Sequence, residues 1–221
     1  MKILLINPGQ YMPTGVSYPL NTFQPMGLGY IAGVLLKNNY QVKIFDVLAE
    51  GYNHEEIIES GKYRYVGLPV KDVRKRIKTF SPDMVGITAP FTSQAKAVHE
   101  MAKLIKHINP KIKVVIGGSY PTTYSDMIFD DKNFDFIVKG EGELTLLELV
   151  KKIEKKDKRF NTIKGLIFRE NNKIIINKPR PLLMGLDNYS VAWELLPMAQ
   201  YFEAAYNIKS SRSTSTFGKR W

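Results

Sequence analysis

The chain has 221 residues and no cysteine, which excludes disulfides, thiolate zinc sites, iron–sulfur ligation and cysteine nucleophiles. Its hydrophobic fraction of 44% is ordinary for a globular protein, and its apolar runs are too short for a membrane span or a signal peptide. The net charge is +11, but the densest basic run, residues 151–159, also holds Glu154 and Asp157 at a predicted helix end. We therefore expect a cytoplasmic protein that binds neither nucleic acid nor a membrane.

Strand-like and helix-like segments alternate along the first two thirds of the chain. Short β-branched apolar runs predict strands, and apolar residues three or four positions apart predict helices. The predicted strands are 3–7, 42–47, 84–88, 112–116 and 134–138, and the predicted helices are 26–37, 70–80, 93–108, 124–129 and 143–154. This alternation predicts an α/β fold, flavodoxin-like or Rossmann-like, with a doubly wound parallel five-stranded sheet that is covered on both faces.

The pattern changes after residue 158. Residues 165–169 and 173–177 flank the turn signal Glu-Asn-Asn and predict a β-hairpin. Beyond Pro179 the chain is proline-rich and irregular, with one further short helix predicted at 193–202 and a loose tail at 210–221. We therefore expect an α/β domain at 1–158 and a linker hairpin with an irregular tail at 159–221.

Four unusual loops follow predicted strands. Ligands of open parallel sheets bind outside the carboxyl ends of the strands, so these loops should share one edge. They are the long loop after residue 7 and the segments APFTSQ at 89–94, GGSYPT at 117–122 and GEGE at 140–143. They are rich in glycine, hydroxyls and aromatics and poor in lysine and arginine, which suits a large, partly apolar ligand held by neutral hydrogen bonds. We interpret Gly118 as a residue that admits this ligand, and not as one that the fold requires.

A dinucleotide-binding motif is the competing interpretation. Gly27, Gly29 and Ala32 match G-x-G-x-x-[GA], and Asp46 ends the next predicted strand, so a Rossmann-type nucleotide-dependent oxidoreductase is the alternative function. That motif requires its glycines in the turn directly after the first strand, whereas a long loop intervenes here. We favour packing of a helix against the sheet by small residues. The three histidines, at 54, 99 and 107, have no metal-ligand spacing, so no protein metal site is predicted.

A family resemblance is carried by ordered segments: ILLINP, PMGLGYIAGVLLKNNYQVKIFD, PDMVGITAPFTSQ, IKVVIGGSYPT and FDFIVKGEGE. In this order they resemble the N-terminal cobalamin-binding domain of the B12-dependent radical SAM enzymes. The later segments IKGLIFRENNKIIINKPRPLL and LDNYSVAWELLPMAQYF resemble the linker hairpin of that family. The resemblance covers residues 2–206. It implies a cobalamin-binding module of a methyltransferase-like parent enzyme, with no catalytic residue and no catalysis expected from this chain alone.

The resemblance also implies a cofactor site along the four loops. The glycines at 117 and 118 would let the backbone approach the corrin ring or its nucleotide tail. Residues 119–122 and 140–143 would line the slot of that tail, Thr88 and 91–93 would meet the corrin edge, and the first loop would lie near the lower face of cobalt. The implied cofactor-binding residues are Asn7, Pro8, Gly9, Gln10, Tyr11, Pro25, Met26, Gly27, Leu28, Thr88, Phe91, Thr92, Ser93, Gly117, Gly118, Ser119, Tyr120, Pro121, Thr122, Gly140, Glu141, Gly142 and Glu143.

Two motifs known from cobalamin-binding and radical SAM proteins are missing from the sequence. The D-x-H-x-x-G motif of methionine-synthase-type B12 domains is absent, so the resemblance implies cobalamin bound base-off and without a histidine on cobalt. The C-x-x-x-C-x-x-C motif, which holds a [4Fe–4S] cluster and SAM in the family, is absent as well. The chain therefore looks truncated before the radical SAM domain. The cluster, SAM and that partner domain are expected only in a full-length relative.

Overall fold

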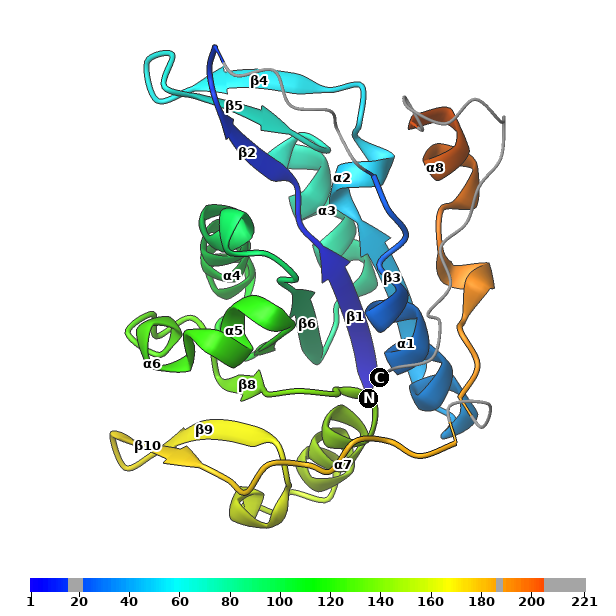
Figure 1. Cartoon of the computed structure of the whole chain (residues 1–221), viewed down its shortest axis with the longest axis vertical. Coiled ribbons are helices and arrows are strands. Elements are labelled where there is room, and N and C mark those ends of the chain that lie inside the picture. Colours follow the sequence, from blue (N-terminus) through cyan, green and yellow to red (C-terminus); the bar gives the residue numbers. More distant parts are fainter. Residues whose placement is uncertain (16–21, 186–188, 205–221) are drawn as a thin grey trace.

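A seven-stranded sheet forms the centre of the molecule (Figure 1). The computed structural model describes residues 1–15, 22–185 and 189–204. The strands are β1 (Lys2–Asn7), β3 (Gln41–Asp46), β6 (Met84–Thr88), β7 (Lys113–Gly117), β8 (Phe136–Val138), β9 (Leu166–Glu170) and β10 (Lys173–Ile176). They lie in the order β10-β9-β8-β7-β6-β1-β3, and the five strands from β8 to β3 are parallel. The predicted α/β fold is therefore confirmed.

The predicted hairpin is present and extends this sheet. Strand β9 pairs antiparallel with β8, with Leu166 opposite Val138, and β10 pairs with β9. The sequence pattern did not indicate that the hairpin joins the sheet, because the pairing brings together segments that are far apart in the chain. The division of the chain at residue 158 stays a prediction.

Helices cover both faces of the sheet. Helices α1 (Met26–Lys37) and α7 (Glu143–Glu154) pack on one face, and α3 (Val70–Phe80), α4 (Ala95–Ile108) and α6 (Ser125–Ile128) pack on the other. Strand β1 shows why both faces are apolar, since Ile3 and Leu5 join the cluster beneath α1 and α7 while Leu4 and Ile6 join the opposite cluster. Alternate side chains of a strand point to opposite faces, so a doubly covered strand is apolar throughout.

A second, three-stranded sheet lies beyond the carboxyl end of β1, at the top of Figure 1. It consists of β2 (Gln10–Pro13), β5 (Tyr63–Val66) and β4 (Glu55–Ile58), all antiparallel, and the short helix α2 (Val47–Glu50) precedes β4 in the chain. The sequence predicted only a long loop for the first of these strands and no element for the other two. Each strand has four residues, and β4 is mostly exposed, so the apolar pattern that indicates a strand is weak.

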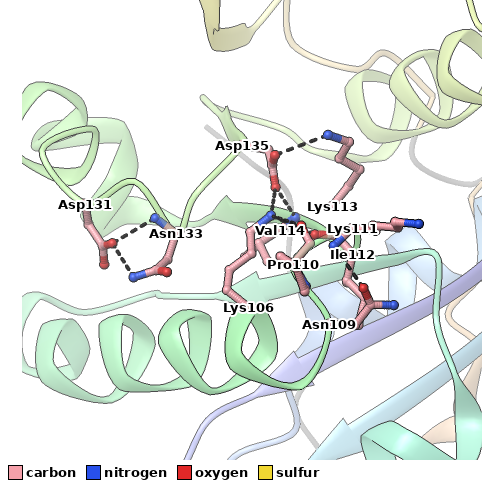
Figure 2. Close-up of polar contacts among 10 residues, drawn as sticks. All are labelled: Lys106, Asn109, Pro110, Lys111, Ile112, Lys113, Val114, Asp131, Asn133 and Asp135. Carbon is pink, nitrogen blue, oxygen red and sulfur yellow. Dashed lines mark hydrogen bonds and ion pairs between the residues drawn. The ribbon is translucent and has the colours of Figure 1, made fainter.

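Polar contacts close the amino-terminal edge of the main sheet, opposite the four loops (Figure 2). The carboxylate of Asp135, just before β8, accepts hydrogen bonds from Lys106 Nζ at 2.6 Å and from Val114 N at 2.8 Å, and Lys113 Nζ lies at 3.4 Å. Lys106 Nζ also donates to Ile112 O at 2.7 Å. These contacts join the end of α4 to β7 and β8, and so fix the strands whose opposite ends carry the glycine loops.

The C-terminal segment runs along α1 and ends in α8 (Met198–Ala204), which lies beside α2 (Figure 1). A Cβ atom at Gly33 would lie 2.0 Å from Ser190 O, and one at Gly29 would lie 2.7 Å from Val191 Cγ1. The predicted packing of α1 against the sheet by small residues therefore holds for Ala32, which is buried in one cluster with Ile3 and Leu5. Gly29 instead packs against the C-terminal segment. The predicted helix at 193–202 is a 3-10 turn, Trp193–Leu195, followed by α8. The predicted loose tail at 210–221 lies outside the described residues.

The remaining short elements are α5 (Ser119–Thr123) and the 3-10 turns Thr92–Gln94 and Phe160–Thr162. The predicted helix at 93–108 therefore begins as a 3-10 turn that leads into α4. No helix among residues 1–15, 22–185 and 189–204 is both long and apolar enough to cross a membrane.

Candidate functional site

A pocket of about 680 Å³ opens at the carboxyl edge of the main sheet, between the strand ends and helices α1 and α7. This volume is typical of small-molecule and cofactor sites. The lining is rich in glycine and aliphatic side chains, with several hydroxyls, two carboxylates and neither lysine nor arginine among the described residues. A ligand of this pocket would be held by apolar contacts and neutral hydrogen bonds.

The pocket brings together residues that the sequence singled out from widely separated segments. They come from the start of α1, the end of β6, the β7–α5 junction and the GEGE loop before α7. The predicted residues in the lining are Gly27, Leu28, Thr88, Gly117, Gly118, Ser119, Thr122, Gly140, Glu141, Gly142 and Glu143.

Two of these glycines have no packing reason to lack a side chain. A Cβ atom at Gly117 would meet only Val138, at an ordinary distance of 3.8 Å, and a Cβ atom at Gly27 would meet nothing within 4 Å. Neither residue has a positive φ. A side chain at either position would therefore occupy pocket space without colliding with the protein, so the two glycines leave part of the pocket open.

Gly118 has a different role from the one that the sequence suggested. Its φ is +118°, and a Cβ atom would lie 2.5 Å from Ala89 O and 2.7 Å from Ala89 C. Hydrogen bonds hold this approach in place, since Ala89 N donates to Gly117 O at 2.8 Å and Tyr120 N donates to Ala89 O at 3.1 Å. The interpretation that Gly118 serves ligand approach and not folding is wrong, because the backbone conformation itself requires glycine. Gly117, one residue earlier, is the position open to a ligand.

The walls of the pocket are joined by Thr122. Its Oγ1 donates to Gly118 O at 2.8 Å and accepts a hydrogen bond from Gly140 N at 3.2 Å. This side chain therefore connects the α5 turn to the GEGE loop. Two flanking loops of the pocket are thus held together by the protein before any ligand is considered.

Glu143, the first residue of α7, presents a buried carboxyl group to the pocket. The residue is 5% exposed, and its Oε2 has no hydrogen-bond partner in the described structure. Burial raises the pKa of this carboxyl, and hydrogen bonds from the Glu143 and Gly142 backbone oppose that shift. An unpartnered buried carboxyl oxygen is costly, which makes this oxygen a candidate hydrogen-bond acceptor for a ligand.

The predicted residues of the first loop lie outside the pocket lining. Gly9 and Tyr11 instead line a smaller cavity of about 330 Å³ near α3 and α4. Pro8 is buried, and Gln10 and Tyr11 belong to β2. Pro25 precedes α1, where its carbonyl accepts from Leu28 N at 2.8 Å, and Met26 is buried.

The remaining predicted residues also lie outside the pocket lining. Phe91, Thr92 and Ser93 are exposed at the 3-10 turn after β6. Tyr120 and Pro121 are buried in α5, where the Tyr120 hydroxyl lies 3.5 Å from His99 Nε2. Cofactor contacts by these residues and by the first loop stay predictions.

The lining also contains residues that the sequence did not single out. Most are aliphatic residues of the strands and helices, whose pattern is the same whether they face the core or a pocket. Gly86 gave the one local signal, because a glycine inside a strand often marks a close approach. The additional lining residues are Leu5, Ile31, Gly86, Ile87, Val115, Thr123, Val138, Leu146 and Leu182.

Asp46, the acidic residue of the dinucleotide motif, is sealed inside the protein. It is 0% exposed and accepts hydrogen bonds from Asn7 Nδ2 at 3.0 Å, Ala49 N at 2.9 Å and the Tyr201 hydroxyl at 2.7 Å. Burial raises its pKa to about 6, against the lowering effect of these hydrogen bonds. Its carboxylate is therefore committed to the fold. This arrangement argues against the dinucleotide alternative, which needs that carboxylate for a ribose.

The three histidines lie away from the pocket lining. His54 Nδ1 is 2.8 Å from Gly67 O, His99 Nδ1 is 2.6 Å from Asp131 Oδ2, and His107 lines the smaller cavity. Within the described ranges, no group of three or more histidine, aspartate or glutamate side chains is placed to hold a metal ion.

Comparison with known proteins identifies relatives over nearly the whole chain. Residues 15–150 match the model of the B12 binding domain. The chain is 33% identical to cytidylyl-2-hydroxyethylphosphonate methyltransferase of Streptomyces wedmorensis, over 99% of this chain and 44% of that protein. It is 34% identical to an uncharacterized methyltransferase of Pyrococcus horikoshii, over 100% of this chain and 47% of that protein. The chain thus spans less than half the length of these relatives.

Solved structures share the fold at lower identity. The cobalamin-dependent radical enzyme OxsB with aqua-cobalamin and S-adenosylmethionine bound matches with a TM-score of 0.62 and 20% identity, over 82% of this chain and 22% of that one. The radical methyltransferase TsrM of Kitasatospora setae with cobalamin and a [4Fe–4S] cluster bound gives 0.60 and 18%, over 86% and 31%. The chain therefore belongs to the B12-binding domain family and resembles the B12 domains of cobalamin-dependent radical SAM enzymes.

Proposed function

We propose that this chain binds cobalamin in the 680 Å³ pocket, as the B12 module of a larger radical SAM enzyme with methyltransferase-like chemistry. The observation that carries the proposal is the open pair Gly27 and Gly117, where the protein leaves space that its own packing does not require. When bound, cobalamin would supply a cobalt centre that can carry a methyl group. The residues of this chain would bind and orient the cofactor and shield it from water.

The chemistry of the lining suits the nucleotide tail of cobalamin. Aliphatic residues and glycines can contact a flat base on both sides, and the hydroxyls of Thr88, Ser119 and Thr122 can hydrogen-bond to polar groups. The carboxylates of Glu141 and Glu143 would accept hydrogen bonds from ribose hydroxyls or amides and would disfavour contact with a phosphate. The pocket is the size of a drug-like ligand, so part of the much larger cofactor would remain outside it.

The proposal includes binding in the base-off form without a histidine on cobalt. It is supported by the positions of His54, His99 and His107, all of which lie outside the pocket lining. The side chains of His54 and His99 are also hydrogen-bonded within the protein.

A pair of titrations tests the proposed ligand. The purified protein is titrated separately with hydroxocobalamin and with NAD, followed by the visible spectrum and by calorimetry. We expect saturable one-to-one binding of hydroxocobalamin and no binding of NAD. Binding of NAD without binding of hydroxocobalamin would overturn the proposal and restore the dinucleotide alternative.

The radical chemistry of the parent enzyme would come from a separate domain. Because the chain has no cysteine, we expect no stoichiometric [4Fe–4S] cluster after anaerobic reconstitution with iron and sulfide. We also expect no 5′-deoxyadenosine from SAM. Turnover of SAM by this chain alone would contradict this assignment of roles.

A further inference from the structure

We propose that residues 178–185 form a retaining strap that slows the release of cobalamin from the pocket. The proposal rests on the proposed function and adds a part of the site that lies outside residues 15–150, the region matched by the B12-binding model. The strap follows β10 and contributes Leu182 to the lining of the pocket.

A carboxylate of the pocket wall holds the strap on one side of Leu182. Glu141 Oε2 accepts a hydrogen bond from Leu183 N at 2.5 Å. Glu141 also lines the pocket, so the GEGE loop and the strap are joined at the pocket itself. Hydrogen bonds to a charged group are among the stronger ones in proteins, so this contact can position the strap.

Arg180 holds the strap on the other side of Leu182. Its side chain is only 10% exposed, and its Nη2 lies 2.8 Å from Glu148 Oε2. Its Nε donates to Thr145 Oγ1 at 2.8 Å, and that hydroxyl donates to Lys164 O at 3.0 Å. Both partners of Arg180 belong to α7, whose first residue, Glu143, lines the pocket. The strap is therefore fixed to the pocket wall at two points that bracket Leu182.

The exposed fraction of Leu182 is high for an aliphatic side chain in the lining of a pocket. Leu182 is 67% exposed although it lines a largely apolar pocket. A cofactor in the pocket would remove part of this leucine from water, which would favour the cofactor-bound state. Met184, two residues further along the strap, is 87% exposed and lies outside the lining, so it provides a matched control.

The strap should act mainly on dissociation, as most changes within one binding site do. The protein is loaded with radiolabelled hydroxocobalamin and chased with a large excess of unlabelled hydroxocobalamin. Leu182→Ser and Arg180→Met are each expected to raise the release rate about fivefold or more, with association within about twofold of wild type. Met184→Ser is expected to release at the wild-type rate. Because Leu182 is exposed, its variant should fold normally even if Arg180→Met does not.

A double variant tests whether Arg180 and Leu182 act together in one strap or contribute independently to retention. If Arg180 acts by holding Leu182 in place, Leu182→Ser with Arg180→Met should release little faster than the faster single variant. Wild-type release rates in both single variants would overturn the strap and leave the proposed function standing. Absence of hydroxocobalamin binding to the wild type would overturn both.

Discussion

The two halves of the carboxyl edge of the main sheet differ in whether the protein itself fills the space at the strand ends. At the ends of β6, β7 and β8, Thr88, Gly117 and Gly140 surround an open pocket. At the ends of β1 and β3, Asn7 and Asp46 are buried and bonded to each other, and α8 covers them through Tyr201. A place at the ligand-binding edge of a parallel sheet is therefore not enough to make a ligand site. We expect a ligand at the half of the edge where the protein leaves open space and where Glu143 Oε2 has no hydrogen-bond partner in the described structure.

The largest difference that we expect between two variants, in stability and in cobalamin binding, is at the neighbouring glycines 117 and 118. Gly118→Val should lower the free energy of unfolding by about 3 kcal/mol or more, because a β-branched residue would be strained at a positive φ and would overlap the backbone of Ala89. Gly117→Val should change stability by less than about 1 kcal/mol and weaken hydroxocobalamin binding by about tenfold or more, because its side chain enters the pocket. Urea melts of the apo proteins and hydroxocobalamin titrations measure both effects. Equal stability of the two variants would contradict the assigned roles.

The pH dependence of stability tests the half of the edge at β1 and β3, where Asp46 is buried. We call this the sealed half. The pKa of Asp46 rises from 3.8 to about 6 on folding, so between these values the folded state binds a proton that the unfolded state releases. The stabilising contribution is therefore complete below about pH 3.8 and is lost as the pH rises through about 6. The difference corresponds to about 3 kcal/mol. Asp46→Asn should remove this component, as measured by urea melts across the range. Parallel stability curves for variant and wild type would show that Asp46 does not titrate in this way.

The hydroxyl of Tyr201 should contribute to stability but not to ligand binding. Tyr201→Phe removes one donor from the buried Asp46 carboxylate, with an expected loss of about 1–2 kcal/mol in the free energy of unfolding. Tyr52→Phe is the matched control, since that hydroxyl meets Glu203 at 3.3 Å on the surface and should cost less than about 0.5 kcal/mol. Both variants should bind hydroxocobalamin within about twofold of wild type. A large loss of affinity in Tyr201→Phe would extend the ligand site into the sealed half.

The smallest expected effect concerns the histidines. Replacing His54, His99 and His107 together by glutamine should leave the visible spectrum of bound hydroxocobalamin unchanged, because none of them lines the pocket. A clear spectral shift in this triple variant would show that an imidazole reaches cobalt.

The local sequence pattern predicted the parallel strands of the main sheet. It failed for strands that are very short or that pair with distant segments. Buried strands such as β1 and β7 are continuous apolar runs, so they were found to within one or two residues. Strand β2 lies inside a loop-like sequence, and its partner β5 is some fifty residues away. Strand β5 also forms a local hairpin with β4, but each of these strands has only four residues and β4 is mostly exposed, so their apolar pattern is weak. Separation along the chain also explains why the hairpin was predicted without its pairing to β8.

The residues of the candidate site also divide into those that a local sequence signal marks and those that only the folded structure shows. The glycine loops could be found because turn residues at strand ends carry a local signal, whereas Val115 and Leu146 have the pattern of ordinary core residues. Leu182 could not be found, because only the folded chain brings it to the GEGE loop. The assignment of Gly118 was wrong because its need for glycine comes from the backbone of Ala89, which is distant in sequence.

Hydrogen–deuterium exchange with and without hydroxocobalamin tests the contrast between the two halves most directly. Residues 115–123 and 138–146 contain the β7–α5 junction and the GEGE loop, and residues 44–51 and 198–204 contain Asp46 and its cover. We predict slower exchange on cobalamin binding in the first pair of segments and unchanged exchange in the second pair. Protection confined to residues 44–51 and 198–204 would contradict the account, because it would place the ligand at the sealed half of the edge.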